Sequence, residues 1–102
     1  MALAVVAATF AQLLDLATFA RMVTIHGPAA EANPLVASLL ADHGLPFVAV
    51  LKLAGLSVIV GVIAVLAARE APKGHPRLAV AIAASAVAAG LFGGWTNVAV
   101  II

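Results

Sequence analysis

Only a few side chains in this 102-residue chain could take part in acid–base or ion-binding chemistry, and Asp15 and Lys52 stand out among them. Both interrupt long apolar stretches, where an ionisable side chain is costly and by default marks a candidate functional site. Their opposite charges predict an ion pair, either as a clasp between two helices or as a carrier of protons or ions. Gln12 and Thr18 flank Asp15 at three-residue intervals, which places all three on one broad face of a helix.

A second group of polar residues follows the first apolar stretch, in the run Glu31-Ala32-Asn33-Pro34. Its carboxylate and amide could bind a cation or a polar lipid head group. The same residues are also typical of a helix start, with Asn33 as the cap, Pro34 in the first turn and Glu31 near the positive end of the helix dipole. The metal-ligating residue types of this region lack the spacing of a metal motif, so we expect no metal and no cofactor.

The composition argues against a soluble, catalytic or nucleic-acid-binding protein. Hydrophobic residues make up 66% of the chain and charged residues 9%, whereas about a quarter of the residues of a soluble domain are charged. A net charge of +1 gives no basic field for nucleic acid. The chain has no cysteine, no Gly-x-Ser-x-Gly and no histidine within an apolar stretch that could activate Ser57 or Ser85, so we expect no enzyme activity.

Three apolar stretches, 2–25, 45–68 and 78–102, reach the length of about 20 residues that a helix needs to cross a bilayer. Because every backbone polar group must be satisfied inside lipid, these stretches are predicted to be helices. The first lacks a basic leading segment and contains Asp15 and Arg21, which favours a retained helix over a cleaved signal peptide. The fold class is therefore all-α, a single membrane domain over 1–102 with three transmembrane helices.

The connection between the first two spans predicts a short helix over 34–43. Ten residues cannot cross a bilayer, so this helix is expected to be interfacial or re-entrant. The other connection, 69–77, carries Arg69, Lys73 and Arg77 against Glu70, and the positive-inside rule places it and the N-terminus in the cytoplasm. The connection 26–44 and the C-terminus are then extracytoplasmic, in a cell (inner or plasma) membrane.

Polar residues from distant parts of the sequence are predicted to gather in the outer leaflet. An up-and-down arrangement at 1.5 Å per residue brings the late part of the first and third spans to the same depth as the early part of the second. The expected polar intramembrane cluster consists of Asp15, Thr18, Glu31, Asn33, Lys52 and Asn97.

Small residues spaced four apart indicate faces where helices approach closely. In the second span they are Ser57 and Gly61. The third span carries two such stripes on neighbouring faces, one through Ser85 and one through Gly90 and Gly94, so that one can pack within the bundle and the other against a partner.

The motifs Asp15-Leu16-Ala17-Thr18 and Gly27 to Pro34, together with Lys52 and Asn97, resemble a family of short prokaryotic multi-pass membrane proteins of unknown function. The pattern of that family is Asp-x-x-Thr, Gly-x-x-x-Glu-x-Asn-Pro, a lysine in the next helix and an asparagine in the last. The resemblance covers most of the chain and implies a membrane fold. It marks residues without naming an activity.

We expect a small non-enzymatic membrane protein, an accessory or assembly subunit that packs against itself or a larger membrane complex. So small a bundle buries little surface, and its connections offer no domain for catalysis. Its expected partners are the lipid bilayer and a second copy or a larger complex, without nucleic acid. The alternative is an oligomeric protein that binds or transports an ion or small solute through the polar cluster.

Overall fold

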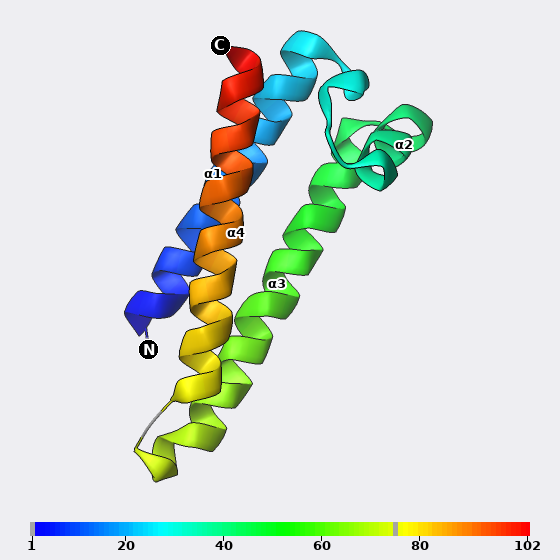
Figure 1. The fold of residues 1–102 in the computed structure, drawn as a ribbon. Helices are drawn as coiled ribbons and strands as arrows, with labels where there is room; N and C mark the ends of the chain where they lie inside the picture. Colours follow the sequence, from blue (N-terminus) through cyan, green and yellow to red (C-terminus); the bar gives the residue numbers. More distant parts are fainter. Residues whose placement is uncertain (1, 75) are drawn as a thin grey trace.

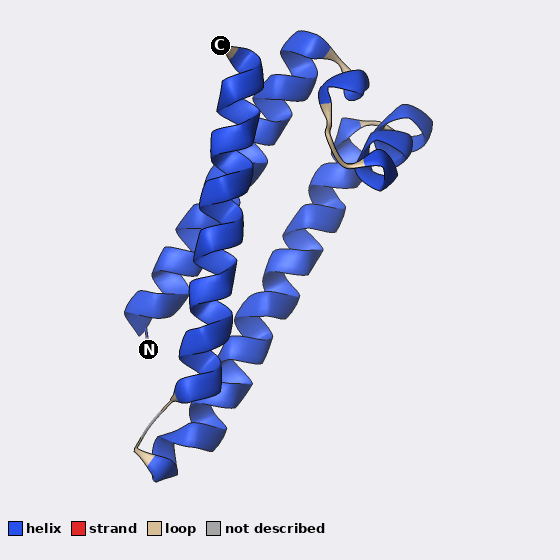
Figure 2. Ribbon diagram, viewed as in Figure 1, coloured by secondary structure: helices blue, strands red, loops and turns tan. Residues whose placement is uncertain are grey.

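Three long helices make up most of the chain in the computed structural model, which describes residues 2–74 and 76–102. They are α1 (Ala2–His26), α3 (Leu45–Glu70) and α4 (Arg77–Ile101), and each is long and apolar enough to cross a membrane. Figure 1 shows α1 and α4 running in the same direction and α3 in the opposite one. All regular elements in the described ranges are helical, which confirms the all-α prediction (Figure 2). Each long helix begins and ends within two residues of its predicted stretch.

The predicted short helix is also present, as α2 (Pro34–His43), preceded by a 3-10 turn at Pro28–Ala30. The Asn33 side chain caps it, since its Oδ1 accepts hydrogen bonds from the backbone N–H groups of Leu35 at 3.0 Å and Val36 at 3.4 Å. Gly44 separates α2 from α3 with a φ of 85°, a conformation that favours glycine. This sharp turn places α2 beside the ends of α1 and α3 (Figure 1), where Leu40 is buried.

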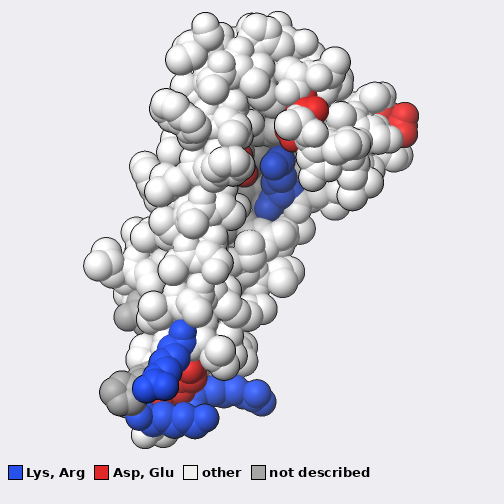
Figure 3. Space-filling view, viewed as in Figure 1, with Lys and Arg blue, Asp and Glu red and all other residues white. Residues whose placement is uncertain are grey.

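The connection between α3 and α4 contains a 3-10 turn at Ala71–Lys73 and several charged side chains. Glu70 is 8% exposed and its two carboxylate oxygens accept hydrogen bonds from the backbone N–H groups of Leu78 at 3.0 Å and Ala79 at 2.9 Å. This carboxylate takes the place of a capping side chain, which Pro76 cannot supply. Figure 3 shows the basic side chains gathered at this end of the molecule. The sequence indicates Glu70 only as a counter-charge in a basic loop, and this capping role was not predicted.

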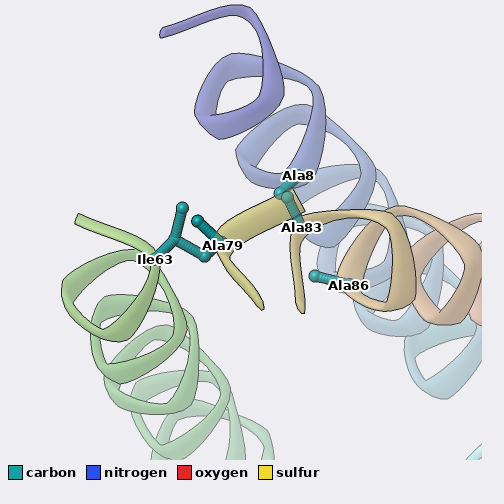
Figure 4. Packing of buried hydrophobic residues seen from close by; sticks show 5 residues of the cluster. All are labelled: Ala8, Ile63, Ala79, Ala83 and Ala86. Carbon is teal, nitrogen blue, oxygen red and sulfur yellow. The ribbon is translucent and has the colours of Figure 1, made fainter. Parts of the chain in front are cut away.

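Small residues form the contact between α1 and α4, the most extensive helix contact in the described chain. The buried positions of α4 recur every three or four residues and are Ala79, Ala83, Ala86, Gly90, Gly94 and Asn97. We call this row the α4 seam. A Cβ atom placed on Gly90 would lie 2.6 Å from the backbone carbonyl of Ala11, so only glycine allows this approach. Figure 4 shows Ala8 of α1 meeting Ala83, and Ile63 of α3 pointing toward Ala79.

Candidate functional site

Asn97 links α4 to α1 through one side-chain amide. Its Nδ2 group lies 3.0 Å from Asp15 Oδ1, 3.2 Å from the Asp15 carbonyl oxygen and 3.1 Å from Thr18 Oγ1. The side chain is 7% exposed, so this amide is buried and donates to α1 instead of to water. Gly93 permits the approach, because a Cβ atom there would lie 2.5 Å from Asp15 Oδ1.

Lys52 brings α3 to the same carboxylate. Its Nζ lies 3.9 Å from Asp15 Oδ2 and 4.5 Å from the centroid of the Phe19 ring, a cation–π distance. The separation from Asp15 exceeds that of a direct hydrogen bond, so the two groups form a loose ion pair. The Lys52 side chain is 30% exposed and the Asp15 side chain 20%, so the pair is partly open on one side. We refer to Asp15, Thr18, Lys52 and Asn97 as the Asp15 cluster.

The remaining polar groups of this region are satisfied by backbone. Thr18 Oγ1 donates to the Leu14 carbonyl oxygen at 2.8 Å, which leaves its lone pairs to accept from Asn97. Gln12 Nε2 donates to the Ala86 carbonyl oxygen at 2.8 Å and forms a second polar link from α1 to α4. In the described ranges, no buried side-chain nitrogen or oxygen lacks a hydrogen-bond partner. Gln12 was placed on the face of Asp15 by its spacing but was not counted in the predicted cluster.

Glu31 and Asn33 occupy a different place from the Asp15 cluster. Glu31 Oε1 accepts a hydrogen bond from the Asn33 backbone N–H at 3.0 Å, and the Asn33 side chain caps α2. Within 2–74 and 76–102, no hydrogen bond or ion pair joins either residue to Asp15 or Lys52. The geometry therefore places both residues at a helix start, one of the two interpretations that the sequence left open.

A cleft of about 160 Å³ lies between α1 and α3 beside the Asp15 cluster. Asp15, Gln12 and Lys52 supply its polar wall, while Gly55 and Ile59 belong to its α3 side. In Figure 3, the charged side chains visible on this face lie in a hollow beside α2, on α2 and around the α3–α4 connection. A space of this size suits a few water molecules or a small ion. For the described residues, no group of three metal-ligating side chains is close enough to hold a metal.

The five predicted packing residues divide into a buried set on α4 and an exposed set on α3 and α4. Gly90 and Gly94 lie in the α4 seam and contact α1. Ser85 is exposed on α4, and its hydroxyl donates to the Ala81 carbonyl oxygen of its own helix at 2.9 Å. Ser57 and Gly61 are exposed on α3, away from the bundle.

Ser57 and Gly61 belong to a longer row of small residues on α3. The row has the three- and four-residue spacing of the α4 seam, every member is exposed, and it consists of Ala54, Ser57, Gly61, Ala64 and Ala68. We call it the α3 seam. The Ser57 hydroxyl donates to the Leu53 carbonyl oxygen at 3.0 Å, so it presents little polarity to a neighbour. Helical spacing places the row away from the buried side chain of Ile63.

No protein-family model matches this chain, and no curated protein or solved structure is found to be similar to it.

Proposed function

We propose that this chain is a non-enzymatic multi-pass membrane protein, an accessory or assembly subunit that docks another membrane helix on the α3 seam. One observation carries the proposal: the α3 seam has the residue types and spacing of the α4 seam, yet it is exposed along its whole length. The neighbour that fits it is a helix of a second copy or of a larger membrane complex.

The α4 seam supplies the precedent within the same chain. There, Gly90 lets the backbone of α1 come so close that no Cβ would fit. On the α3 seam, Gly61 has no atom within 4 Å of the position of a Cβ, so the same close approach is open. Lipid tails are as apolar as leucine, so helices in a bilayer associate by close packing of small residues and not by the hydrophobic effect. An unoccupied small-residue seam therefore favours a protein neighbour.

The surroundings of the α3 seam support the same interpretation. Val58 and Val65 are exposed beside it and supply larger apolar side chains at its edge. In α3, 17% of the most apolar window is buried within the chain, the same share as in α1 and less than the 28% of α4. This helix therefore has most of its surface available for lipid or for another helix.

The Asp15 cluster acts in this proposal as a clasp that, together with helix packing, holds α3 beside α1. Asn97 holds α4 to α1, and Lys52 holds α3 to α1 through the same carboxylate. In a membrane, an unpaired charge on either partner costs about 3 kcal/mol, so the pairing also stabilises insertion. We place the basic α3–α4 connection and the N-terminus in the cytoplasm, and α2 in the outer interface of a cell membrane.

Substitution of Gly61 by leucine tests the docking surface. Gly61→Leu puts a large side chain in the middle of the α3 seam, and Gly55→Leu is the matched control. Gly55 also has open space around its Cβ position, and it lies about 120° away around the same helix. After gentle solubilisation of native membranes, we expect Gly61→Leu to abolish the high-mass species on a native gel and Gly55→Leu to preserve it. Equal migration of both variants with the unsubstituted protein would reject the proposal.

A second candidate function, binding or transport of an ion or small solute, is favoured by the cleft. The charged side chains of Asp15 and Lys52 both line this cleft of about 160 Å³. In proteoliposomes, a transporter of this kind loses flux in the Asp15→Asn variant while it remains folded and inserted. Flux that survives Asp15→Asn would eliminate this candidate. As an independent check, a transporter is expected to lose flux in the Gly55→Leu variant as well, because the leucine side chain narrows the cleft.

A further inference from the structure

We propose that the basic end of α4 binds an anionic phospholipid, with the lipid phosphate at Arg77 and one acyl chain in an apolar groove along the helix. This site lies apart from the α3 seam and does not depend on the docking of another helix there.

The groove is shallow and consists of two adjoining hollows that are open to the surroundings. The first, about 430 Å³, is lined by Pro76, Arg77, Val80 and Ala81. The second, about 440 Å³, shares Val80 and continues between α4 and Ala4 of α1. The two together extend along α4 as far as Leu91.

One face of α4 forms the floor of this groove. Its residues recur every three or four positions and are Arg77, Ala81, Ala84, Ala88 and Leu91. At 1.5 Å per residue, the distance along the helix from the first to the last is about 21 Å. One leaflet of a hydrocarbon core about 30 Å thick contributes about 15 Å, so the groove accommodates the chain of a lipid from one leaflet. The three alanines leave room for that chain.

The charges at the mouth of the groove suit a phosphate. Arg69, Lys73 and Arg77 are all exposed around the α3–α4 connection. The acidic residue of this connection, Glu70, uses both oxygens for the backbone N–H groups of α4. Within the described ranges, no ion pair engages Arg77. An arginine guanidinium binds phosphate through two parallel hydrogen bonds, so Arg77 is the natural first contact for the lipid.

The combination of charge and groove selects a lipid over other ligands. A free phosphate would use the arginine and leave the groove empty. An apolar protein helix would use the groove and leave the cation unpaired. An anionic phospholipid uses both, because its phosphate lies directly above its acyl chains.

Native mass spectrometry of the delipidated protein in detergent tests this site. The probes are dioleoylphosphatidylglycerol and, as the zwitterionic comparison, dioleoylphosphatidylcholine. We expect tighter binding of the anionic lipid and a loss of about fivefold in its affinity in the Arg77→Gln variant. Arg21→Gln is the matched control, since Arg21 is an exposed arginine of α1 and lies outside the groove.

The groove is tested separately by Ala84→Phe and Ala88→Phe, two substitutions at exposed positions that fill the groove and leave the α4 seam intact. Each is expected to weaken binding of the anionic lipid at unchanged helicity. Soluble glycerophosphoglycerol, which has the head group but no chains, should not compete at equal concentration. Equal binding of the two lipids, full binding by Arg77→Gln or by both phenylalanine variants, or competition by the soluble head group would overturn the proposal.

Discussion

Asn97 is the residue on which the polar contacts between α1 and α4 converge. Its amide donates to a carboxylate, a backbone carbonyl and a hydroxyl, all on α1. Because Asn97 is 7% exposed, little water can replace these contacts, so a lost donor leaves unsatisfied acceptors. One buried amide thus aligns two helices along their length.

Replacement of Asn97 by leucine keeps the number and branching of the side-chain heavy atoms and removes the donor. We expect Asn97→Leu to lower the free energy of unfolding by about 1–3 kcal/mol, because Asp15 and Thr18 lose a buried partner. Unfolding in mixed SDS–detergent micelles, followed by circular dichroism, measures this change. Thr96→Val is the control, since the Thr96 hydroxyl bonds only within its own helix, to the Gly93 carbonyl oxygen. Equal losses in the two variants would mean that the contacts of Asn97 with α1 contribute nothing.

A double-mutant cycle on Asp15 and Lys52 separates the clasp from a proton or ion carrier. Lys52→Met alone leaves Asp15 without its counter-charge and is expected to destabilise the fold by about 1 kcal/mol or more. Adding Asp15→Asn removes the remaining charge and should restore most of that loss. A clasp therefore predicts that the double variant still assembles. A carrier predicts that flux disappears in the double variant although stability returns.

Residue types and spacing were enough to single out most of the site. Asp15 and Lys52 were singled out because charges of opposite sign lay at matching depths in two helices, and Asn97 because it was the late polar residue of the third. Glu31 and Asn33 were grouped with them by depth alone, whereas local backbone hydrogen bonds hold them at the start of α2. A polar side chain can either cap a nearby helix or join a distant polar cluster, and the sequence alone does not show which of the two it does.

At the scale of helices, the glycines of α4 set how closely this helix approaches α1. Along the α4 seam, the approach is closest at Gly90 and looser at Gly94, where a Cβ would lie 3.6 Å from Leu14 Cγ. The sequence showed two stripes of small residues on α4 but not which of them α1 would use. That choice depends on the direction in which α1 and α3 lie, a long-range property.

The two glycines give a matched pair of alanine substitutions on one helix. Gly90→Ala would place its methyl group 2.6 Å from the Ala11 backbone, so it must separate α1 from α4 and is expected to cost about 1–3 kcal/mol. Gly94→Ala makes only ordinary contacts, and the better helix propensity of alanine is expected to leave stability unchanged or raised by up to about 1 kcal/mol. Thermal unfolding in detergent compares them. A Gly90→Ala variant as stable as Gly94→Ala would contradict the close packing described for this seam.

At the scale of the whole molecule, apolar length fixed the three long helices and a cap with a proline fixed the short one. These features are local, and all four helices lie where the sequence places them. The capping role of Glu70 was not predicted, because it depends on how the chain turns between α3 and α4. The same is true of the exposure of the α3 seam, which follows from α1 and α4 packing mainly against each other.

Site-directed crosslinking in native membranes tests most directly whether the α3 seam docks another membrane helix. The chain has no cysteine, so a benzophenone maleimide attaches to this chain only at the introduced position of Ser57→Cys or of Val62→Cys. These positions lie about 140° apart around α3. We expect a discrete crosslinked protein product from Ser57→Cys and none from Val62→Cys. A protein product of equal yield from both positions, or none from Ser57→Cys, would contradict docking at the α3 seam.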